Sequence, residues 1–472
     1  MSKTYRPYNP DQQFLMPPSM REWLPESHLV YFVSDTIDEM DISEIEGIYE
    51  KSLVGHPPYN PRMMTKLLFY AYCTGVFSSR KIAKKLEDDV AFRVLAAGNR
   101  PDFRTIWDFR KLHLLALKGL FKEVLMLCRR AGMVRLGHVA LDGTKQKANA
   151  SKHKAMSYGR MKDESARLES EIAELLASAE RVDEKEDAEY GKDSRGDELP
   201  KELAFRDGRL AKIRQAMREL EADAKKSEEE AASEGDVDAD TKAKKRGRPK
   251  KKPSGVPDDK TQKNFTDPES KVMLAGDKSF IQGYNAQAAV DSDYQVIVAS
   301  MVTAQASDSP HTQAMVEQIE ENTGRLPDEM SLDAGYYSDA NVKYLEEEKK
   351  IDVYMPPCRL KHREYRSAVP DDLTEDSSIR DRMKAKVLTA EGREKYGLRK
   401  QTVEPVFGQT KECRGFRRFS MRGQEACDAE WSFVCAAHNL LKLFKYGAIA
   451  IAKMTEECVT GAQNIDILAA AA

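Results

Sequence analysis

The sequence predicts a mixed α/β protein that begins with an all-helical region and carries a helical insert within its α/β part. Three observations support this fold class. Apolar residues recur at helical spacing up to about residue 132. From residue 133 onward, strand-like runs alternate with helical segments. Between these strand-like runs, 49 of the 93 residues from Arg160 to Lys252 are charged, which predicts a solvent-exposed insert.

Composition limits the classes of protein to which the chain can belong. The chain has 472 residues, with 75 Lys and Arg against 78 Asp and Glu, so a polyanion partner would have to be bound by local basic patches. Its seven cysteines are dispersed and include no CxxC pair, which argues against a disulfide framework or a zinc module. We find no signal-peptide core and no membrane-spanning apolar run, and therefore expect a cytoplasmic, nucleoid-associated protein without a membrane partner.

The N-terminal region shows three helix starts. Asn60–Pro61 precedes an apolar helical pattern, Ser78–Ser79 can cap a second helix, and Asp102 can cap a third helix over about residues 105–132. Short helices with basic faces and tight turns predict a DNA-binding region of helix-turn-helix type over residues 1–132. A plain helical bundle with solvated lysines is the alternative.

Strand patterns begin at residue 137. The run HVALDGT predicts a buried strand that ends in a turn at Asp142–Gly143. A hairpin is expected over residues 280–304, with its turn at Asp291–Asp293. A helix from His311 to Thr323, a strand that ends at Asp333, another helix and a strand at DVYMPP follow, which predicts a mixed sheet.

The charged insert contains a helical pattern and a basic tract. Its apolar residues recur at spacings of three, four and seven, which predicts a helical hairpin or short coiled coil; these residues are Leu168, Ile172, Leu175, Leu203, Leu210, Ile213, Met217 and Leu220. Arg246-Gly247-Arg248-Pro249, within Lys244–Lys252, resembles an AT-hook that inserts arginines into the minor groove of A·T-rich DNA. Nonspecific electrostatic attraction to DNA is the alternative.

Three acidic residues are candidates for a metal site. Asp142 and Asp333 each end a predicted strand, and Glu404 lies in a predicted helix near Lys400 and Lys411. Carboxylates in such positions suit Mg²⁺ or Mn²⁺, and two ions can catalyse phosphodiester displacement. The alternative is that Asp-Gly and Asp-Ala-Gly are ordinary turn residues. Asp291 and Asp308 are interpreted as turn residues as well.

These residues resemble a known family, the DDE transposases of bacterial insertion sequences. The resemblance runs through RPDFRTIWDFRKLH, LDGT, NFTDPES, GYNAQAAVD, LDAGYYS, TVEPVFGQTKECRGFRRF and WSFVCAAHNLLKL. It implies an RNase H-like catalytic core in which Asp142, Asp333 and Glu404 form the metal-binding catalytic triad for two Mg²⁺ or Mn²⁺ ions. The implied boundaries are a core at 133–159 and 262–446, an insert at 160–261, and a tail at 447–472.

The family's last motif is spaced differently here. The family places three residues between its Arg and Glu, whereas four separate Arg399 from Glu404. Either Lys400 takes the basic role, or the helix begins differently. The interval from Glu404 to Lys411 fits the family, and Tyr396 matches the motif's tyrosine.

Several residues, most of them basic, are candidates for contacting DNA. They are Lys145, Lys147, Arg246, Arg248, Tyr396, Arg399, Lys400, Lys411, Arg414, Arg417 and Arg418. The basic residues from Arg414 to Arg422 alternate with Phe416 and Phe419, so this run could follow the backbone or stack on an unpaired base. The alternative is a loop whose phenylalanines are core residues and whose arginines are solvated.

The resemblance implies a complete reaction. The enzyme would bind the terminal inverted repeats, hydrolyse a phosphodiester to release a 3′-hydroxyl, and direct that hydroxyl onto target DNA, as a homodimer in the DNA complex. Two alternatives remain, namely a catalytically inactive DNA-binding or architectural protein and a metal-dependent nuclease without strand transfer.

Overall fold

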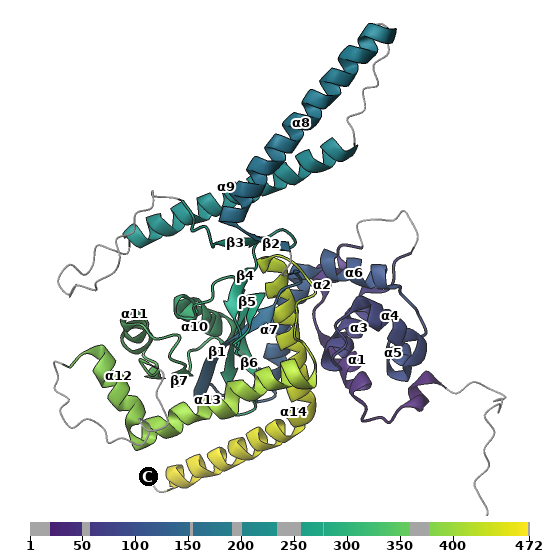
Figure 1. Cartoon of the computed structure of the whole chain (residues 1–472). Helices are drawn as coiled ribbons and strands as arrows, with labels where there is room; N and C mark the ends of the chain where they lie inside the picture. Colours follow the sequence, from purple (N-terminus) through teal and green to yellow (C-terminus); the bar gives the residue numbers. More distant parts are fainter. Residues whose placement is uncertain are drawn as a thin grey trace, which may run out of the picture.

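The computed structural model describes residues 19–49, 57–151, 154–190, 201–233, 256–276, 278–358 and 377–470. Figure 1 shows N-terminal helices beside a central sheet with its own helices, and a pair of long helices that projects away from both. Arg246 and Arg248 of the AT-hook-like tract lie outside the described residues. Nowhere in these ranges is a helix long and apolar enough to cross a membrane.

The N-terminal region is helical, as the apolar spacing predicts. A short 3₁₀ helix (Met20–Trp23) precedes α1 (Leu29–Glu39), α2 (Ser43–Glu46), α3 (Pro61–Cys73), α4 (Ser79–Asp88), α5 (Val90–Leu95), α6 (Phe103–Leu112) and α7 (Leu114–Arg130). Asn60 caps α3 by accepting a hydrogen bond from the Met63 amide, and Asp102 caps α6 through the Thr105 amide. Ser78 occupies the N-cap position of α4, but its side chain makes no capping hydrogen bond.

The single helix expected over residues 105–132 is wrong, because the structure divides it into α6 and α7 at His113. The backbone of His113 leaves the helical conformation, with φ −103° and ψ 23°. Its buried ring lies 2.9 Å from the Tyr49 hydroxyl, measured from Nε2. A contact with a residue distant in sequence therefore accompanies a break that the local helical pattern does not reveal.

The central sheet is mixed and has six strands, β1 (His138–Lys147), β4 (Lys271–Leu274), β5 (Phe280–Asp291), β6 (Ile297–Thr303), β7 (Glu329–Leu332) and β8 (Asp352–Tyr354). β1 pairs antiparallel with β5 on one side and parallel with β7 on the other, and β7 pairs parallel with β8. β4 and β6 pair with successive parts of β5. The predicted mixed sheet and hairpin are confirmed.

Helices surround this sheet. They are α10 (Thr312–Thr323), α11 (Asp339–Lys343), α12 (Ile379–Leu388), α13 (Ala390–Gly408) and α14 (Gln424–Ala470), with π-helical turns at Tyr344–Glu348 and Gln409–Cys413. Helices α10 and α14 protect the outer edge of β6. Asn439 of α14 hydrogen-bonds both backbone groups of Ile297 at 2.8 Å, and Asn322 of α10 donates to the Val298 carbonyl at 2.9 Å. These side chains satisfy backbone groups of β6 that would otherwise be open to another strand.

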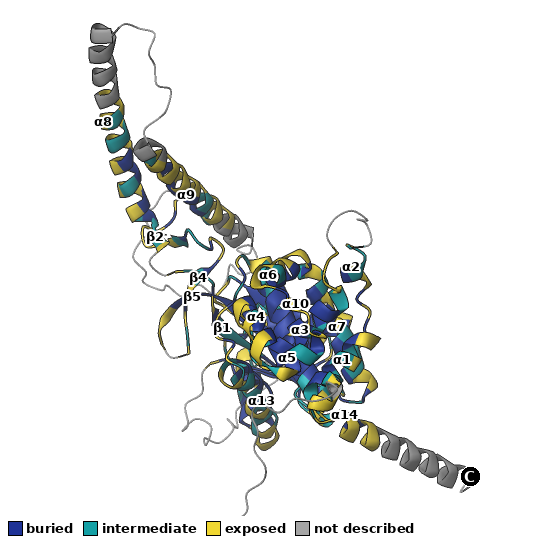
Figure 2. Ribbon diagram, turned by 90° about the vertical axis from the view of Figure 1, so that its right-hand side faces the viewer, coloured by how far each residue is buried: buried dark blue, intermediate teal, exposed yellow. Residues whose placement is uncertain are grey.

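The insert forms two antiparallel helices, α8 (Tyr158–Tyr190) and α9 (Lys201–Ser233), as predicted. Ion pairs join Arg209 to Glu164 and Arg206 to Glu171 across the pair. Their common buried cluster lies near the sheet, where strands β2 (Ala155–Ser157) and β3 (Gln262–Asn264) flank the helices. The cluster consists of Tyr158, Met161, Leu168, Leu210, Ile213, Ala216 and Leu220. Figure 2 shows that much of the described surface of α8 and α9 is exposed, in contrast to the buried interior of the body.

A buried ion pair joins the N-terminal helices to the rest of the protein. Arg110 of α6 donates to Glu430 of α14 at 2.9 Å, and the side chains of both residues are at most 3% exposed. Glu430 also accepts hydrogen bonds from the Tyr72 hydroxyl at 3.2 Å and from the Ser420 amide at 2.8 Å. Because these partners come from α3, α6 and the loop before α14, one carboxylate fixes three segments together.

We predict that Glu430→Ala destabilises the protein by about 3–5 kcal/mol, because it leaves the Arg110 guanidinium buried without its counter-charge. Chemical denaturation with a probe in the N-terminal helices measures this effect. Glu412→Ala is the matched control, since the exposed Arg417–Glu412 pair contributes at most about 1 kcal/mol. Equal and small effects of the two substitutions would contradict the role given to Glu430.

Candidate functional site

The pairing of β1 with β7 places Asp142 and Asp333 next to each other. Parallel pairing ends where Leu141 lies opposite Leu332, and each aspartate directly follows the last residue that its strand contributes to this parallel pairing. Because adjacent parallel strands lie about 4.8 Å apart, the two residues occupy neighbouring positions at one end of this pairing. This register therefore brings both aspartates to the same end of the β1–β7 pairing.

Asp142 nevertheless does not end its strand, so the turn predicted at Asp142–Gly143 is wrong. β1 continues to Lys147, which pairs with Gly283 of β5. The longer partner β5 supports residues of β1 that extend beyond the end of β7. At Asp142, β1 is therefore paired with β5 on one side and unpaired on its β7 side. The pairing with β5 holds the Asp142 backbone in place, and the unpaired side leaves its carboxylate accessible to a ligand.

Glu404 lies on helix α13 and is linked to Asp142 by Arg399, which lies on the same helix. The Arg399 Nη1 atom donates to Asp142 Oδ2 at 2.7 Å, and its Nη2 atom lies 3.5 Å from Glu404 Oε1. The Arg399 side chain is 14% exposed, whereas that of Glu404 is 49% exposed. One largely buried guanidinium thus connects the carboxylates of two elements distant in sequence.

The unusual spacing between Arg399 and Glu404 does not exclude Arg399 from the site. Lys400 is exposed, whereas Arg399 contacts both the Asp142 and the Glu404 carboxylates. The guanidinium carbon of Arg399 also lies 5.9 Å from the centre of the Tyr396 ring. The π-helical turn that follows α13 brings Lys411 to β1, where its amine donates to the Thr144 hydroxyl.

A fourth carboxylate, Asp308, lies beside these groups. Its Oδ1 atom accepts hydrogen bonds from Asn285 at 2.6 Å, from Gln287 at 2.8 Å and from Lys145 at 3.1 Å. A methyl group on Gly335 would lie 2.9 Å from Asp333 Oδ1 and 3.2 Å from Asp308 Oδ2. Gly335, two residues after Asp333, therefore leaves room for both carboxylates.

The interpretation of Asp308 as a turn residue misses this position. β6 is antiparallel to β5, and β5 is antiparallel to β1, so β6 runs in the same direction as β1 and β7. Asp308 follows β6 by a few residues and thus returns to the same edge as Asp333. The position of Asp308 beside Asp333 follows from the strand order and cannot be predicted from the sequence around Asp308. Asp291 is the last residue of β5, and its carboxylate accepts hydrogen bonds from the Leu136 and Asp293 amides beside the hairpin turn.

The electrostatic environment favours the protonated form of Asp142. Burial raises its pKa to about 7, and the charges of Asp333 and Asp308 act in the same direction. Arg399 and the hydrogen bond from the Gly143 amide oppose this shift but do not reverse it. Crowded carboxylates of this kind are common where a protein holds a cation or performs acid–base chemistry.

Two of the candidate lysines lie within the site, and a third lies beyond it. Lys411 is partly buried against β1, and this burial lowers the pKa of its amine. The Lys145 amine contacts the Ala306 carbonyl at 2.7 Å as well as Asp308. Lys147 is exposed further along the strand. The site thus carries positive charge on two sides of its carboxylates.

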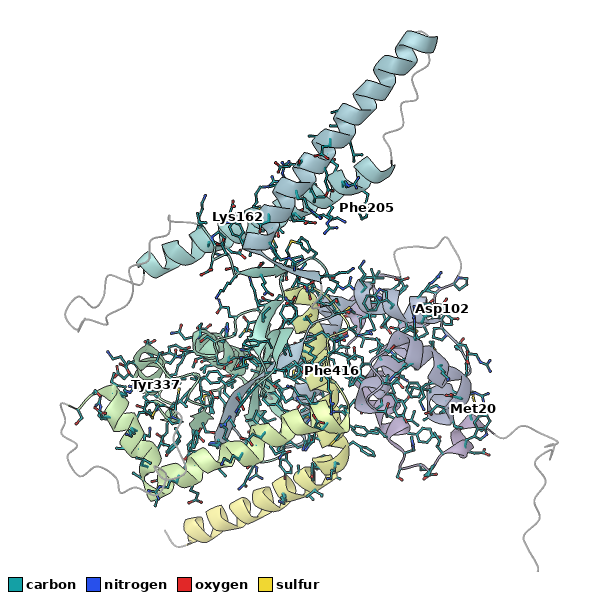
Figure 3. The ribbon with its side chains drawn as sticks, in the orientation of Figure 1. Met20, Asp102, Lys162, Phe205, Tyr337 and Phe416 are labelled. Carbon is teal, nitrogen blue, oxygen red and sulfur yellow. The ribbon has the colours of Figure 1, made fainter. Side chains whose placement is uncertain are left out.

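The basic run after α13 combines a buried and an exposed part. Phe416 and Phe419 are each 1% exposed and pack in the core, so base stacking by these two rings is ruled out in this conformation. Phe416 lies between the sheet and the N-terminal helices in Figure 3. The Arg414 guanidinium donates to Thr410 at 2.7 Å and contacts His438, so it already has polar partners within the protein. Arg417 and Arg418 are exposed.

The donors of this site suit a hard divalent cation. Among the residues that the structure describes, no three His, Cys, Asp or Glu side chains are placed to hold one metal ion together. Arg399 instead supplies positive charge to Asp142 and Glu404. Carboxylate oxygens are the ligands that Mg²⁺ and Mn²⁺ prefer, and the charges of Asp333 and Asp308 that help raise the pKa of Asp142 also attract a cation. The chemistry of the donors therefore suits such an ion, whereas their placement in this structure puts the Arg399 guanidinium between the Asp142 and Glu404 carboxylates.

We predict that Asp142→Asn stabilises the metal-free protein increasingly as the pH rises. The wild-type carboxyl keeps its proton in the folded state up to about pH 7, whereas the unfolded chain loses it near pH 4. Wild-type stability therefore falls relative to the variant by about 1.4 kcal/mol per pH unit within that window. Thermal unfolding midpoints measured in EDTA from pH 5 to 8 test this prediction.

Asp41→Asn is the control for this measurement. A hydrogen bond from the Ser43 amide lowers the pKa of the exposed Asp41, so its effect on stability is constant above pH 5. A stability difference between Asp142→Asn and wild type that is constant or decreases with pH would contradict the crowded-carboxylate account.

Two family models match the chain. The model described as "Transposase domain (DUF772)" matches residues 18–112, which include most of the N-terminal helices. The model described as "Transposase DDE domain" matches residues 245–440, which include Asp333 and Glu404, and Asp142 lies between the two matched segments. No curated protein and no solved structure matches the chain. With both matches in this order, the chain belongs to the DDE transposases of insertion sequences.

Proposed function

We propose that this transposase binds the terminal inverted repeats of its element, hydrolyses a phosphodiester at each 3′ end, and transfers the new 3′-hydroxyl to target DNA. The observation that carries the proposal is the convergence of Asp142, Asp333 and Glu404 at one edge of the sheet. Two divalent ions bound there would activate the attacking water or hydroxyl and stabilise the leaving oxygen.

In this proposal, Asp142, Asp333 and Glu404 are the residues that would hold the ions. β1 and β7 fix the two aspartates through backbone pairing, whereas Glu404 depends on the position of α13. Arg399 holds the Asp142 and Glu404 carboxylates near each other when no other cation does so. Once it moves aside, its guanidinium is available to a DNA phosphate, which is the role that the sequence suggests.

The lysines around the site would position DNA. Lys411 is held against Thr144, and Lys145 against Asp308, so neither amine has to be ordered when the substrate arrives. Asp308 thereby acts as a positioning residue for Lys145. Exposed Lys147, Lys400, Arg417 and Arg418 extend the positive surface and suit contacts with phosphates on either side of the cleaved bond.

The arrangement of the domains is part of the same proposal. A sheet with an antiparallel half and a parallel half supports an RNase H-like core interrupted by α8 and α9, and the short N-terminal helices with exposed lysines support DNA binding of helix-turn-helix type. Leu176 and Phe205 are 45% and 71% exposed on the projecting pair. Phe205 is labelled on this arm in Figure 3. These apolar side chains favour contact with a second copy in a dimeric DNA complex.

We predict that Asp142→Asn, Asp333→Asn and Glu404→Gln each reduce cleavage and joining at least about 100-fold, because each removes a carboxylate that would hold an ion. The assay uses purified protein, labelled DNA that carries the repeats flanking its own gene, a supercoiled target and Mg²⁺. Binding to the labelled DNA should persist in all three variants. Asp35→Asn, a substitution of an exposed aspartate on α1, is the control and should keep full activity.

Each other result selects a different function. Binding by wild type without cleavage or joining, in Mg²⁺ and in Mn²⁺, would replace the proposal with a DNA-binding or architectural protein. Cleavage without joining would leave a metal-dependent nuclease. Full activity in any one of the three carboxylate variants would remove that residue from the proposed triad.

A further inference from the structure

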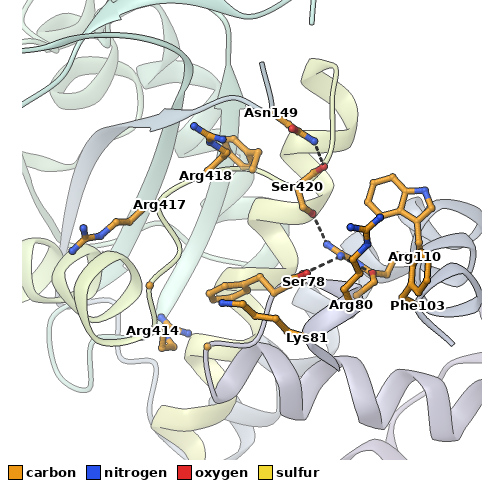
Figure 4. A pocket seen from close by; sticks show the side chains of 16 residues that line it. Ser78, Arg80, Lys81, Phe103, Arg110, Asn149, Arg414, Arg417, Arg418 and Ser420 are labelled. Carbon is orange, nitrogen blue, oxygen red and sulfur yellow. Dashed lines mark hydrogen bonds between the residues drawn. The ribbon is translucent and has the colours of Figure 1, made fainter. Parts of the chain in front are cut away.

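A basic cleft lies between the N-terminal helices and the loop before α14, away from the carboxylates. Its volume is about 700 Å³, and its walls come from α4, α6, residues 414–420 and Asn149. Figure 4 shows Arg80 and Lys81 of α4 on one side of this space and Arg418 on the other. Six cations line the cleft, and its lining contains no acidic residue; the cations are Arg80, Lys81, Arg110, Arg414, Arg417 and Arg418.

Three of these cations already have polar partners within the protein. The guanidinium of Arg110 is paired with Glu430, that of Arg417 with Glu412, and that of Arg414 donates to Thr410. The remaining three, Arg80, Lys81 and Arg418, are exposed, and none of them forms an ion pair within the described ranges. An uncompensated cluster of cations in one concave surface attracts an anionic ligand.

Aromatic side chains of α6 order one wall of the cleft. The Arg80 guanidinium carbon lies 5.1 Å from the centre of the Phe103 ring, and Phe103 itself is 37% exposed. Trp107 also lines the cleft, with the Arg110 guanidinium carbon 5.8 Å from its ring. The Phe103 contact restricts the Arg80 side chain, so less conformational entropy is lost when its guanidinium binds a phosphate.

The loop on the opposite wall is fixed to both parts of the protein. Asn149 donates to the Ser420 carbonyl at 2.7 Å, and Gln146 donates to the Phe416 carbonyl at 2.6 Å. The Ser420 hydroxyl accepts from the guanidinium of Arg110 at 2.7 Å. The cations on the two sides of the cleft therefore face each other across a rigid gap.

Strand β1 connects this cleft to the carboxylates. The backbone of Arg418 forms a parallel β-bridge with Lys147, and the Phe419 amide donates to the Lys147 carbonyl at 2.9 Å. Lys147 lies five residues beyond Asp142 on β1, a separation of about 17 Å at ~3.3 Å per residue. That distance corresponds to about five phosphates at ~3.4 Å per nucleotide of one strand.

We propose that this cleft binds the phosphodiester backbone of duplex DNA, about five nucleotides from the phosphate placed at the carboxylates. The inference rests on the proposed function and adds to it a second point of attachment, one shared by the N-terminal helices and the core. The cleft offers lysine and arginine side chains that bind phosphates and not base edges. The contact therefore contributes affinity and positions the DNA independently of the DNA sequence.

The test is a salt titration of binding with a 30-bp duplex of arbitrary sequence. The variants are Arg80→Ala/Lys81→Ala and the triple variant that adds Arg418→Ala. At about 0.15 M salt the triple variant should bind roughly 10-fold or more weakly than wild type. The slope of log Kd against log salt should decrease by up to about 0.9 for each cation that loses a phosphate contact.

Lys260→Ala/Lys343→Ala is the matched control, because these exposed lysines, one before β3 and one on α11, lie outside the cleft and outside the N-terminal helices. It should bind with the affinity and salt slope of wild type. All substituted residues are exposed, and an unchanged thermal unfolding midpoint shows that each variant is folded.

The results separate this inference from the proposed function. Loss of affinity and of salt slope in the cleft variants, with neither change in the control, supports the cleft. Wild-type affinity and slope in the triple variant would overturn the cleft while leaving transposition intact. If wild type itself does not bind the duplex at low salt, the proposed DNA chemistry fails along with the cleft.

Discussion

The site depends on a short stretch of parallel backbone pairing between β1 and β7. Because this pairing ends with Leu141 opposite Leu332, the following aspartates, Asp142 and Asp333, are placed side by side by backbone hydrogen bonds without help from their own side chains. β5 then supports β1 beyond that point, which keeps Asp142 on a rigid strand. A shift of one residue in the β1–β7 register would turn one aspartate to the other face of the sheet and separate the pair.

Electrostatics explains why basic side chains surround this pair. Burial makes the Asp142 carboxyl costly to charge, and the charges of Asp333 and Asp308 add to that cost. Arg399 offsets part of that cost, and the Lys145 amine lies on Asp308. In this account, the Arg399 and Lys145 side chains neutralise the carboxylates as long as no metal ion is bound. The same two side chains bind DNA phosphates once DNA and metal ions are present.

The sequence predicts which strands and helices carry the acidic residues of this site better than it predicts how these strands and helices pack together. Asp142, Asp333 and the helical position of Glu404 follow from strand and helix patterns that are local in the chain. Asp308 escapes the same reasoning, because its place depends on the direction of β6 within the sheet. The part played by Arg399 likewise depends on how α13 packs against β1, which one-dimensional spacing does not contain.

Long-range contacts also set the architecture of the basic run. A sequence that alternates arginine and phenylalanine leaves open which side chains are buried, and the burial of Phe416 and Phe419 directs Arg417 and Arg418 outward. The buried Arg110–Glu430 pair then fixes this loop against the N-terminal helices. The cleft between this loop and the N-terminal helices therefore results from tertiary packing, and no single sequence motif predicts it.

The most direct test of the central claim, that these carboxylates hold divalent cations, is metal-directed cleavage of the protein backbone. Fe²⁺ replaces Mg²⁺ in the wild-type protein bound to its DNA ends, ascorbate and peroxide are added, and the fragments are mapped by mass spectrometry. The account predicts cuts near Asp142, Asp333 and Glu404 that excess Mg²⁺ suppresses. Cuts confined to other segments, or cuts at these three that Mg²⁺ does not reduce, would contradict it.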